Sequence, residues 1–277
     1  MPEPWLHCIR GDAPLIVAFP HTGTQIPEPI ERRLLSPWLA RKDADWWVHR
    51  LYDFVTDLGA TTVRTDISRT VIDVNRDPTG ASLYPGQATT GLCPLVTFDG
   101  EALYQPGEEP DSSEIAGRRD TYFRPYHETL EAEIARLKKS HGEVMLYDAH
   151  SIRSLIPRLF DGELPHLNLG TDNGRTCSPA LEAVAADACS RSGFTSVLNG
   201  RFRGGWTTRR YGKPETGVHA IQMELACRTY MDEPLQATPA NWPPDFDPQR
   251  AQKSRQALSR LLDGCLSFFN ARKQERS

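Results

Sequence analysis

The chain has 277 residues, of which 39% are hydrophobic and 25% are charged, and its formal net charge at pH 7 is -4. These values are ordinary for a globular protein and exclude a disordered or fibrous chain. The mild charge gives no indication of a nucleic-acid partner, and no apolar run approaches the ~20 residues that cross a bilayer. The length allows one large α/β domain, so we expect residues 1–277 to form a single domain.

The N-terminus and the cysteines both favour a cytoplasmic location. The first residues, MPEPWLHCIRGDAP, lack the basic start and apolar stretch of an export signal. The six cysteines are scattered without CxxC pairs, as is typical of reduced thiols. We expect a cytoplasmic monomer or small homo-oligomer whose partner is a small molecule, with no membrane or nucleic-acid partner.

Apolar runs rich in β-branched residues alternate with segments of helical periodicity. This pattern predicts an α/β fold in which helices cover a mostly parallel sheet in three layers. Apolar residues at spacings of three and four predict helices over 47–58, 122–137 and about 248–270. The expected strands are 14–19, 61–66, 71–75, 143–149, 167–171, 196–199 and 219–226.

The segment 77–117 is rich in Pro, Gly and Thr and is longer than an ordinary connection. Loops of this length are usually lids or binding loops, so we expect it to lie near the active site. Residues 241–248, NWPPDFDP, predict a rigid turn into the last helix.

Polar side chains stand at the ends of three predicted strands, where ligands of α/β proteins bind. His21 follows the strand PLIVAFP, His150 ends EVMLYDAH, and Glu224 lies within AIQMELA. A catalytic zinc takes three protein ligands from histidine and carboxylate and leaves one position open for water. The pattern therefore indicates a metal-centred hydrolytic site.

Each of these residues also has a structural interpretation. A histidine at a strand end can simply be hydrogen-bonded, and Asp148 either orients His150 or, with Ser151, caps a helical turn. A buried Glu224 would have the raised pKa that suits a general base, unless strand alternation places it on a solvated face.

The third metal ligand is less clearly indicated. The segment RKDADWWVHR offers Asp43, Asp45 and His49, with Asp45 and His49 one helical turn apart. Asp45 is equally well placed to cap the helix that follows, and the sequence does not decide between the two roles.

Arginines form two groups, around the short strands 61–75 and in a glycine-rich loop. Guanidinium groups bind carboxylates through two hydrogen bonds, so arginines near a metal predict a small acidic substrate. Surface ion pairs are the alternative, and we expect only two or three arginines to face the site. The two groups are Arg64, Arg69 and Arg76, and Arg201, Arg203, Arg209 and Arg210.

Taken in order, the motifs from about residue 14 to 235 resemble the N-formylglutamate amidohydrolase family, the deformylases of histidine degradation. Each motif alone is weak, but their ordered combination is specific. The motifs are PHTG at 20–23, DADW at 43–46, DVNRDP at 73–78, Tyr126-His127, DAHS at 148–151, Gly204-Gly205 followed by Tyr211-Gly212, and HAIQMELACRTYMDE at 219–233.

The resemblance implies a fold similar to the zinc carboxypeptidases, with a mixed sheet of about eight strands. It implies metal-dependent hydrolysis of N-formyl-L-glutamate to formate and L-glutamate. The metal, Zn²⁺ or another divalent ion, would be held by His21, Asp45 and His150, with Glu224 as the base. In the carboxypeptidases an acidic ligand follows three residues after the first histidine. That position is Thr24 here, so Asp43 competes with Asp45.

The resemblance also implies that Asn75 and Arg76 hold a substrate carboxylate, and we expect Arg69 and Arg209 to assist while Asp148 orients His150. One alternative function is hydrolysis of another N-acylated acidic amino acid or a peptide fragment. The other is non-catalytic binding of an acidic metabolite.

Overall fold

The centre of the fold is a mixed sheet, which has seven strands over residues 3–81, 86 and 89–275, the part of the chain that the computed structural model describes. The strand order is β1-β3-β2-β4-β7-β5-β6. Strands β3, β2, β4 and β7 are parallel, whereas β1 and β5 run antiparallel to their neighbours β3 and β7. The strands are β1 (Leu6–Ile9), β2 (Leu15–Phe19), β3 (Thr61–Thr65), β4 (Val144–Ile152), β5 (Leu167–Gly170), β6 (Ser196–Leu198) and β7 (Val218–Ala226).

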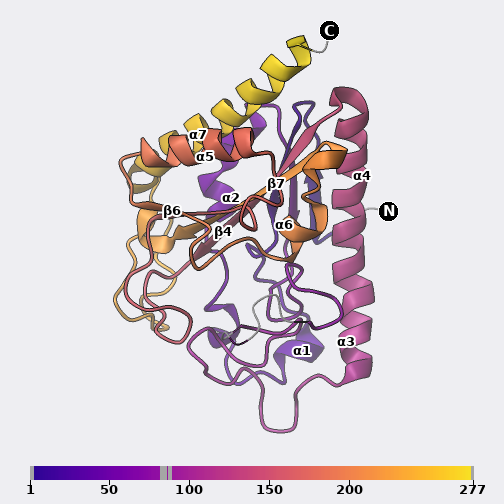
Figure 1. Ribbon diagram of the computed structural model, residues 1–277. Helices are drawn as coiled ribbons and strands as arrows, with labels where there is room; N and C mark the ends of the chain where they lie inside the picture. Colours follow the sequence, from indigo (N-terminus) through magenta and orange to yellow (C-terminus); the bar gives the residue numbers. More distant parts are fainter. Residues whose placement is uncertain (1–2, 82–85, 87–88, 276–277) are drawn as a thin grey trace.

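Helices cover both faces of this sheet, so the expected three-layer α/β class is confirmed. Figure 1 shows α4 along one face and α5 with α7 across the other. A π-helical turn at Arg119–Phe123 joins α3 to α4. The helices are α1 (Glu28–Glu31), α2 (Val48–Leu51), α3 (Ser112–Arg118), α4 (Arg124–His141), α5 (Pro179–Ser190), α6 (Trp206–Tyr211) and α7 (Pro248–Glu275), with 3-10 turns at Leu39–Arg41, Asp53–Thr56, Pro214–Thr216 and Cys227–Thr229.

Strand alternation divides the core into two apolar layers. In β4, Val144 and Leu146 pack in the layer that contains Leu130 of α4. Met145 and Tyr147 point the other way, into the layer formed by α5 and α7. Because both faces of the central strands are buried, these strands are nearly continuously apolar, and their polar residues require a specific explanation.

Several predicted elements differ from the structure. Residues 71–75 are not a strand but part of a turn. Val71 and Ile72 are apolar because they are buried in the core layer that also contains residues of α4, and not because they pair in the sheet. The prediction of a helix over 47–58 is replaced by the short α2 and a 3-10 turn. The sequence patterns missed β1 and α5, and the observed sheet has seven strands rather than about eight among the described residues.

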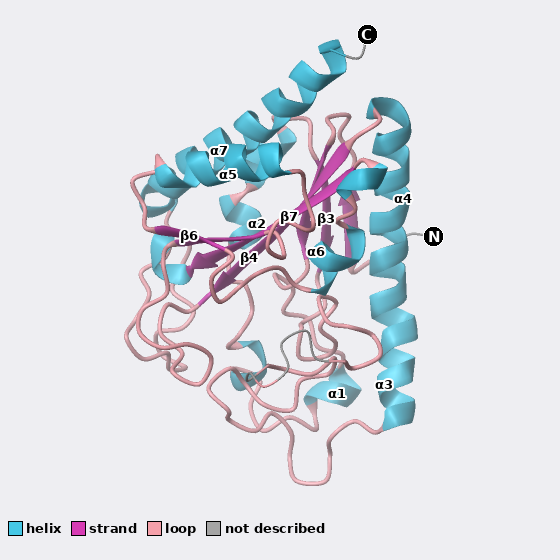
Figure 2. Ribbon diagram, viewed as in Figure 1, coloured by secondary structure: helices cyan, strands magenta, loops and turns pink. Residues whose placement is uncertain are grey.

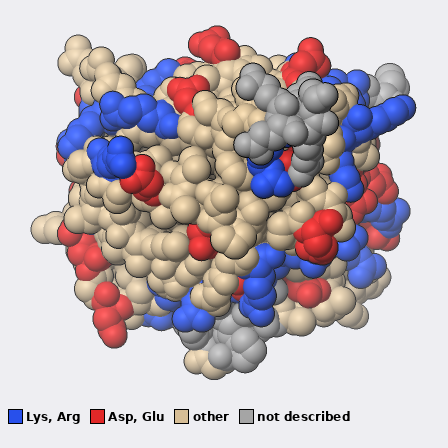
Figure 3. Space-filling model, turned by 45° about the horizontal axis from the view of Figure 1, so that its top comes forward, with Lys and Arg blue, Asp and Glu red and all other residues tan. Residues whose placement is uncertain are grey.

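The long segment expected near the active site is irregular up to Pro110, and α3 then begins behind the N-cap Asp111. Its residues 82–85 and 87–88 lie outside the described residues. Loops gather at one end of the sheet (Figure 2). Within the described part of the chain, no helix has the length and apolar character needed to span a membrane. Acidic and basic side chains are interspersed on the face shown in Figure 3.

Candidate metal centre and active site

The neighbouring strands β4 and β7 carry the polar core of the site. In their parallel register His150 lies opposite Glu224, and Asp148 lies opposite Gln222. Since residues two apart share a face of a strand, all four side chains project from the same side of the sheet. β4 continues to Ile152 and is buried throughout, so Asp148 is part of a strand and does not cap a helix.

His21 lies just beyond the end of β2, where the chain runs so close to the backbone of Asp66 that a glycine is required at position 23. A Cβ at Gly23 would lie 2.4 Å from the carbonyl carbon of Asp66, which excludes any side chain there. The His21 carbonyl oxygen accepts a hydrogen bond from the Asp45 backbone N–H at 2.9 Å. This bond joins the two loops that supply the first histidine and the acid.

His21, Asp45 and His150 form one buried cluster whose donor atoms all lie within 4.8 Å of one another. The Nδ1 atoms of the two histidines are 3.1 Å apart. The Asp45 Oδ2 atom lies 3.0 Å from Nδ1 of His150 and 3.6 Å from Nδ1 of His21. The cluster therefore has the size and the ligand types of a metal site.

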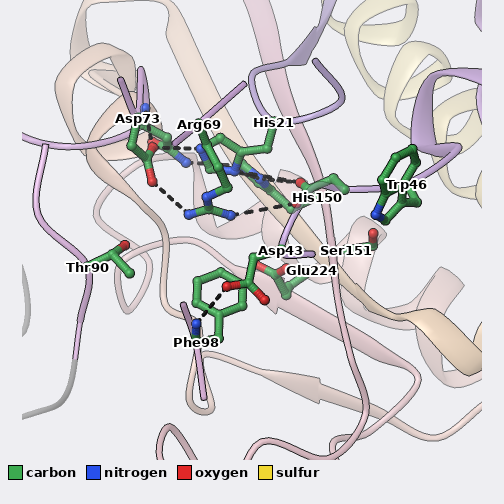
Figure 4. Close-up of polar contacts among 12 residues, drawn as sticks. His21, Asp43, Trp46, Arg69, Asp73, Thr90, Phe98, His150, Ser151 and Glu224 are labelled. Carbon is green, nitrogen blue, oxygen red and sulfur yellow. Dashed lines mark hydrogen bonds and ion pairs between the residues drawn. The ribbon is translucent and has the colours of Figure 1, made fainter. Parts of the chain in front are cut away.

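A second carboxylate holds the far side of each imidazole. The Nε2 atom of His21 lies 2.6 Å from Oδ1 of Asp73, and Nε2 of His150 lies 3.0 Å from Oδ2 of Asp148. A ring that donates its Nε2–H to a carboxylate presents the Nδ1 lone pair on its other side. Figure 4 shows Asp73 joined to both His21 and Arg69. Asp148 thus contacts His150, and Asp73 is the corresponding partner of His21.

The local electrostatics suit a cation. Two Nδ1 lone pairs and a carboxylate that meet at about 3 Å repel one another unless a positive charge lies between them. Oδ1 of Asp45 is buried without a hydrogen-bond partner. Although burial opposes it, the carboxylates of Asp148 and Asp45 raise the pKa of His150 well above its usual value. His21, Asp45 and His150 could therefore bind a metal ion.

The structure distinguishes between Asp43 and Asp45, the two candidates for the acidic metal ligand. Oδ2 of Asp43 accepts the backbone N–H of Phe98 at 2.6 Å, and its Oδ1 lies 3.2 Å from the guanidinium of Arg153. Asp43 therefore anchors the 97–101 segment rather than the metal cluster. The alternative role of Asp45 as a helix cap also fails, because α2 begins after Trp47 without a side-chain cap.

Glu224 has the environment expected of a general base. Its side chain is 7% exposed, which excludes the solvated-face alternative, and its Oε2 accepts a hydrogen bond from Nε2 of Gln222 at 3.1 Å. Burial raises the pKa of Glu224 to about 8. A carboxylate with a raised pKa can both take up and return a proton near neutral pH.

One cavity exposes these groups to solvent, and its wall includes His21, His150 and Glu224. Among the predicted substrate-binding residues, Arg69, Asn75 and Arg76 line it, whereas Arg209 does not appear among the described lining residues. Arg209 instead lies 3.5 Å from Oδ1 of Asp172. Arg201, in the same glycine-rich loop, lines the cavity in its place. Residues of the 77–117 segment also form part of the cavity wall. They are Asp77, Gly80, Ala81, Thr89, Thr90, Gly91, Leu92 and Phe98.

The two lining arginines from the 69–76 turn differ in their contacts. Arg69 is buried, donates to Oδ2 of Asp73 at 2.6 Å and lies over the Phe98 ring at 4.7 Å. Arg76 is more exposed and donates to the carbonyl and hydroxyl oxygens of Thr90. Three of the five N–H donors of Arg76 are bound to neutral groups, and its Nη2 also lies 3.7 Å from Oδ2 of Asp73.

Asn75 lines the cavity, but its side-chain amide is hydrogen-bonded to other groups of the protein. Its Oδ1 accepts the backbone N–H of Thr207 at 2.8 Å, and its Nδ2 donates to Oδ2 of Asp148 at 3.1 Å. The structure therefore places Asn75 as a support for Asp148. Sequence reasoning missed this role because Thr207 lies 132 residues away.

A buried His–Asp–His cluster beside a strand glutamate, at the carboxyl ends of parallel strands, is the arrangement of a hydrolytic α/β enzyme. Residues 13–231 match the N-formylglutamate amidohydrolase family. The chain belongs to this family.

Similar proteins extend the match over nearly the whole chain. An N-formylglutamate deformylase of Pseudomonas aeruginosa is 44% identical over 264 residues, covering 95% of this chain and 96% of that protein. An N-formylglutamate deformylase of Pseudomonas putida is 42% identical over 266 residues, covering 96% and 97%. The crystal structure of N-formylglutamate amidohydrolase from Ralstonia eutropha JMP134 has a TM-score of 0.74 at 21% identity and covers 94% of this chain and 96% of that one. The last comparison supports the fold.

Proposed function

We propose that this protein hydrolyses the formamide C–N bond of N-formyl-L-glutamate, which yields formate and L-glutamate. The observation that carries the proposal is the buried convergence of His21, Asp45 and His150 beside Glu224. The two Pseudomonas deformylases support the choice of substrate.

We propose Zn²⁺ as the ion held by His21, Asp45 and His150, because two imidazoles and one carboxylate are a usual ligand set of catalytic zinc. Such an ion supplies a Lewis acid for the formyl carbonyl and lowers the pKa of a bound water. Asp73 and Asp148 keep the Nδ1 atoms of the two histidines turned toward the cluster.

Glu224 handles the protons in this proposal. Its carboxylate takes a proton from the attacking water, whose oxygen bonds to the formyl carbon. The C–N bond then breaks, and Glu224 returns the proton to the amine nitrogen of the leaving glutamate. Burial of Glu224 keeps its proton affinity high enough for the second step.

The cavity arginines recognise the two substrate carboxylates. We assign this role to Arg76 and Arg201, with Arg69 adding positive charge, because all three line the cavity beside His21 and Glu224. Binding the non-reacting end of the substrate fixes the formyl group at the reacting centre.

The test is an assay of glutamate release over a panel of substrates, with formate also measured for N-formylglutamate. Purified protein, with zinc added, should release formate from N-formylglutamate and act poorly on N-acetylglutamate and N-succinylglutamate. Equal rates on the larger acyl groups would instead indicate a broader amidohydrolase. Absence of any acid product, together with ligand-induced thermal stabilisation, would indicate a binding protein.

A further inference from the structure

The segment that leads into α6 docks onto the sheet through two side-chain amides. The backbone N–H of Gly205 donates to Oε1 of Gln222 at 2.6 Å, and the backbone N–H of Thr207 donates to Oδ1 of Asn75 at 2.8 Å. A peptide N–H can only donate, so the oxygen of each amide must face this segment. The orientation of both amide groups is therefore fixed by the backbone.

The NH₂ end of each amide consequently points to a carboxylate of the active site. Nδ2 of Asn75 donates to Oδ2 of Asp148, and Nε2 of Gln222 donates to Oε2 of Glu224, both at 3.1 Å. The two hydrogen-bond chains run side by side, since Asp148 and Gln222 are register partners on β4 and β7.

The close approach depends on the pair of glycines. A Cβ at Gly205 would lie 2.5 Å from Nδ2 of Asn75, and Gly204 has φ +116°, which an L side chain rarely adopts. The same loop carries Arg201 and Phe202 into the cavity wall. The backbone of one loop therefore contacts the substrate-binding wall and, through Gln222, the proposed base.

Resting on the proposed function, we infer that Gln222 is a positioning residue for Glu224. Its Nε2–H fixes the orientation of the Glu224 carboxylate, whose register partner is His150, while Gly205 prevents the amide from turning over. Gln222 is itself 4% exposed and lines the same cavity as Glu224. A buried carboxylate that loses such a donor is poorly satisfied and turns toward another partner.

The variant that tests this is Gln222→Glu. It keeps an oxygen for the Gly205 N–H and replaces the amide donor to Glu224 with a second carboxyl group. We expect kcat to fall by about 10- to 100-fold, the loss of one hydrogen bond to a charged group. KM and the metal content per chain should stay within about twofold. Gln222→Met, which adds no charge, should also lower kcat.

Two comparisons remove the remaining ambiguities. Gln105→Glu adds the same charge at an exposed glutamine whose Nε2 donates to the Arg32 carbonyl, and it should leave kcat unchanged. In a Glu224→Gln background, the Gln222→Met change should have almost no further effect, because the two residues act as a unit.

Several outcomes would overturn the inference. These are a kcat within twofold of wild type for Gln222→Glu, a rise in KM at constant kcat, and additive effects in the double variant. Wild-type protein without formate release would defeat the proposed function instead. In that case, crystal structures of the wild type and of Gln222→Met still test the positioning role of Gln222. The Glu224 side chain should be rotated in the variant, and an unmoved Glu224 refutes the inference.

Discussion

His150 and Glu224 stand opposite each other on the parallel strands β4 and β7, with their side chains on the same face of the sheet. One register thus brings a candidate metal ligand and a candidate proton carrier together without any contribution from flexible loops. His21 and Asp45 are then added from loops that are joined by a backbone hydrogen bond. A site built mainly on rigid strands keeps its reacting groups in fixed positions.

Asp45, and not Asp43, should determine metal affinity. The change Asp45→Asn removes a charged ligand atom from the cluster. We expect zinc affinity to fall by more than about 100-fold, because mutation of a residue that only hydrogen-bonds to a metal ligand already lowers metal affinity about 10- to 100-fold. Titration calorimetry with zinc measures it. Asp43→Asn, the matched change at the aspartate bound to Phe98 and Arg153, should retain zinc. The reverse pattern would make Asp43 the ligand.

Asp73 should support metal binding through His21. In Asp73→Asn, the neutral side chain can accept a hydrogen bond from His21 or from Arg69 but cannot satisfy both as the carboxylate does. We expect a 10- to 100-fold loss of zinc affinity. The control is Asp66→Asn, which alters an aspartate–histidine pair outside the metal cluster, formed with the half-exposed His7. Equal affinities for wild type and Asp73→Asn would show that His21 needs no such partner.

Arg201 and Arg209 lie in one loop, and their variants should behave differently. Arg201 lines the cavity, whereas Arg209 lies beside Asp172. Arg201→Gln should raise the KM for N-formylglutamate by about 10-fold or more, as expected for the loss of a charged hydrogen bond to a carboxylate. Steady-state kinetics of both variants provide the measurement. A larger KM effect for Arg209→Gln would return substrate recognition to the residue first predicted from the sequence.

His127 should make the stability of the fold pH-dependent. Its ring bonds the Val74 carbonyl and the Tyr211 hydroxyl, and burial lowers the pKa of His127 from 6.5 to about 4. Between these values the unfolded chain binds a proton that folded His127 does not. The contribution of His127 to the free energy of unfolding is therefore at its maximum above pH 6.5. It falls as the pH drops toward 4, by up to about 3 kcal/mol.

Urea unfolding of chelator-treated protein at pH 7 and pH 4.5 measures this effect. The variant His127→Gln cannot take up a proton, so its free energy of unfolding should fall less over the same interval. Identical pH dependence in both proteins would mean that His127 is not the responsible group.

The parts of the fold that follow from local patterns were predictable. The strands around Val17, Leu146 and Ile221 are fully buried on both sides, and such strands read as continuous apolar runs. The turn at Val71 and Ile72 has the same composition, but its backbone pairs with other groups, including the side chain of Arg118. Composition alone does not distinguish an apolar turn from a strand.

The active-site residues also divide into those indicated by local sequence patterns and those that depend on long-range contacts. His21, His150 and Glu224 stand at strand ends, which the sequence identifies. The choice between Asp43 and Asp45 depends on where Phe98 and Arg153 lie, at separations of 55 and 110 residues from Asp43. The support that Gln222 gives to Glu224 likewise depends on Gly205, a contact that no spacing in the sequence encodes.

The most direct test of the account is the turnover of Glu224→Gln with zinc bound. The amide has nearly the shape of the carboxylate but cannot take a proton from water. We predict that zinc content and substrate affinity stay near the wild-type values while kcat for formate release from N-formylglutamate falls by about 10²–10⁴-fold. A kcat within about tenfold of wild type, at equal zinc content, would contradict the assignment of Glu224 as the base.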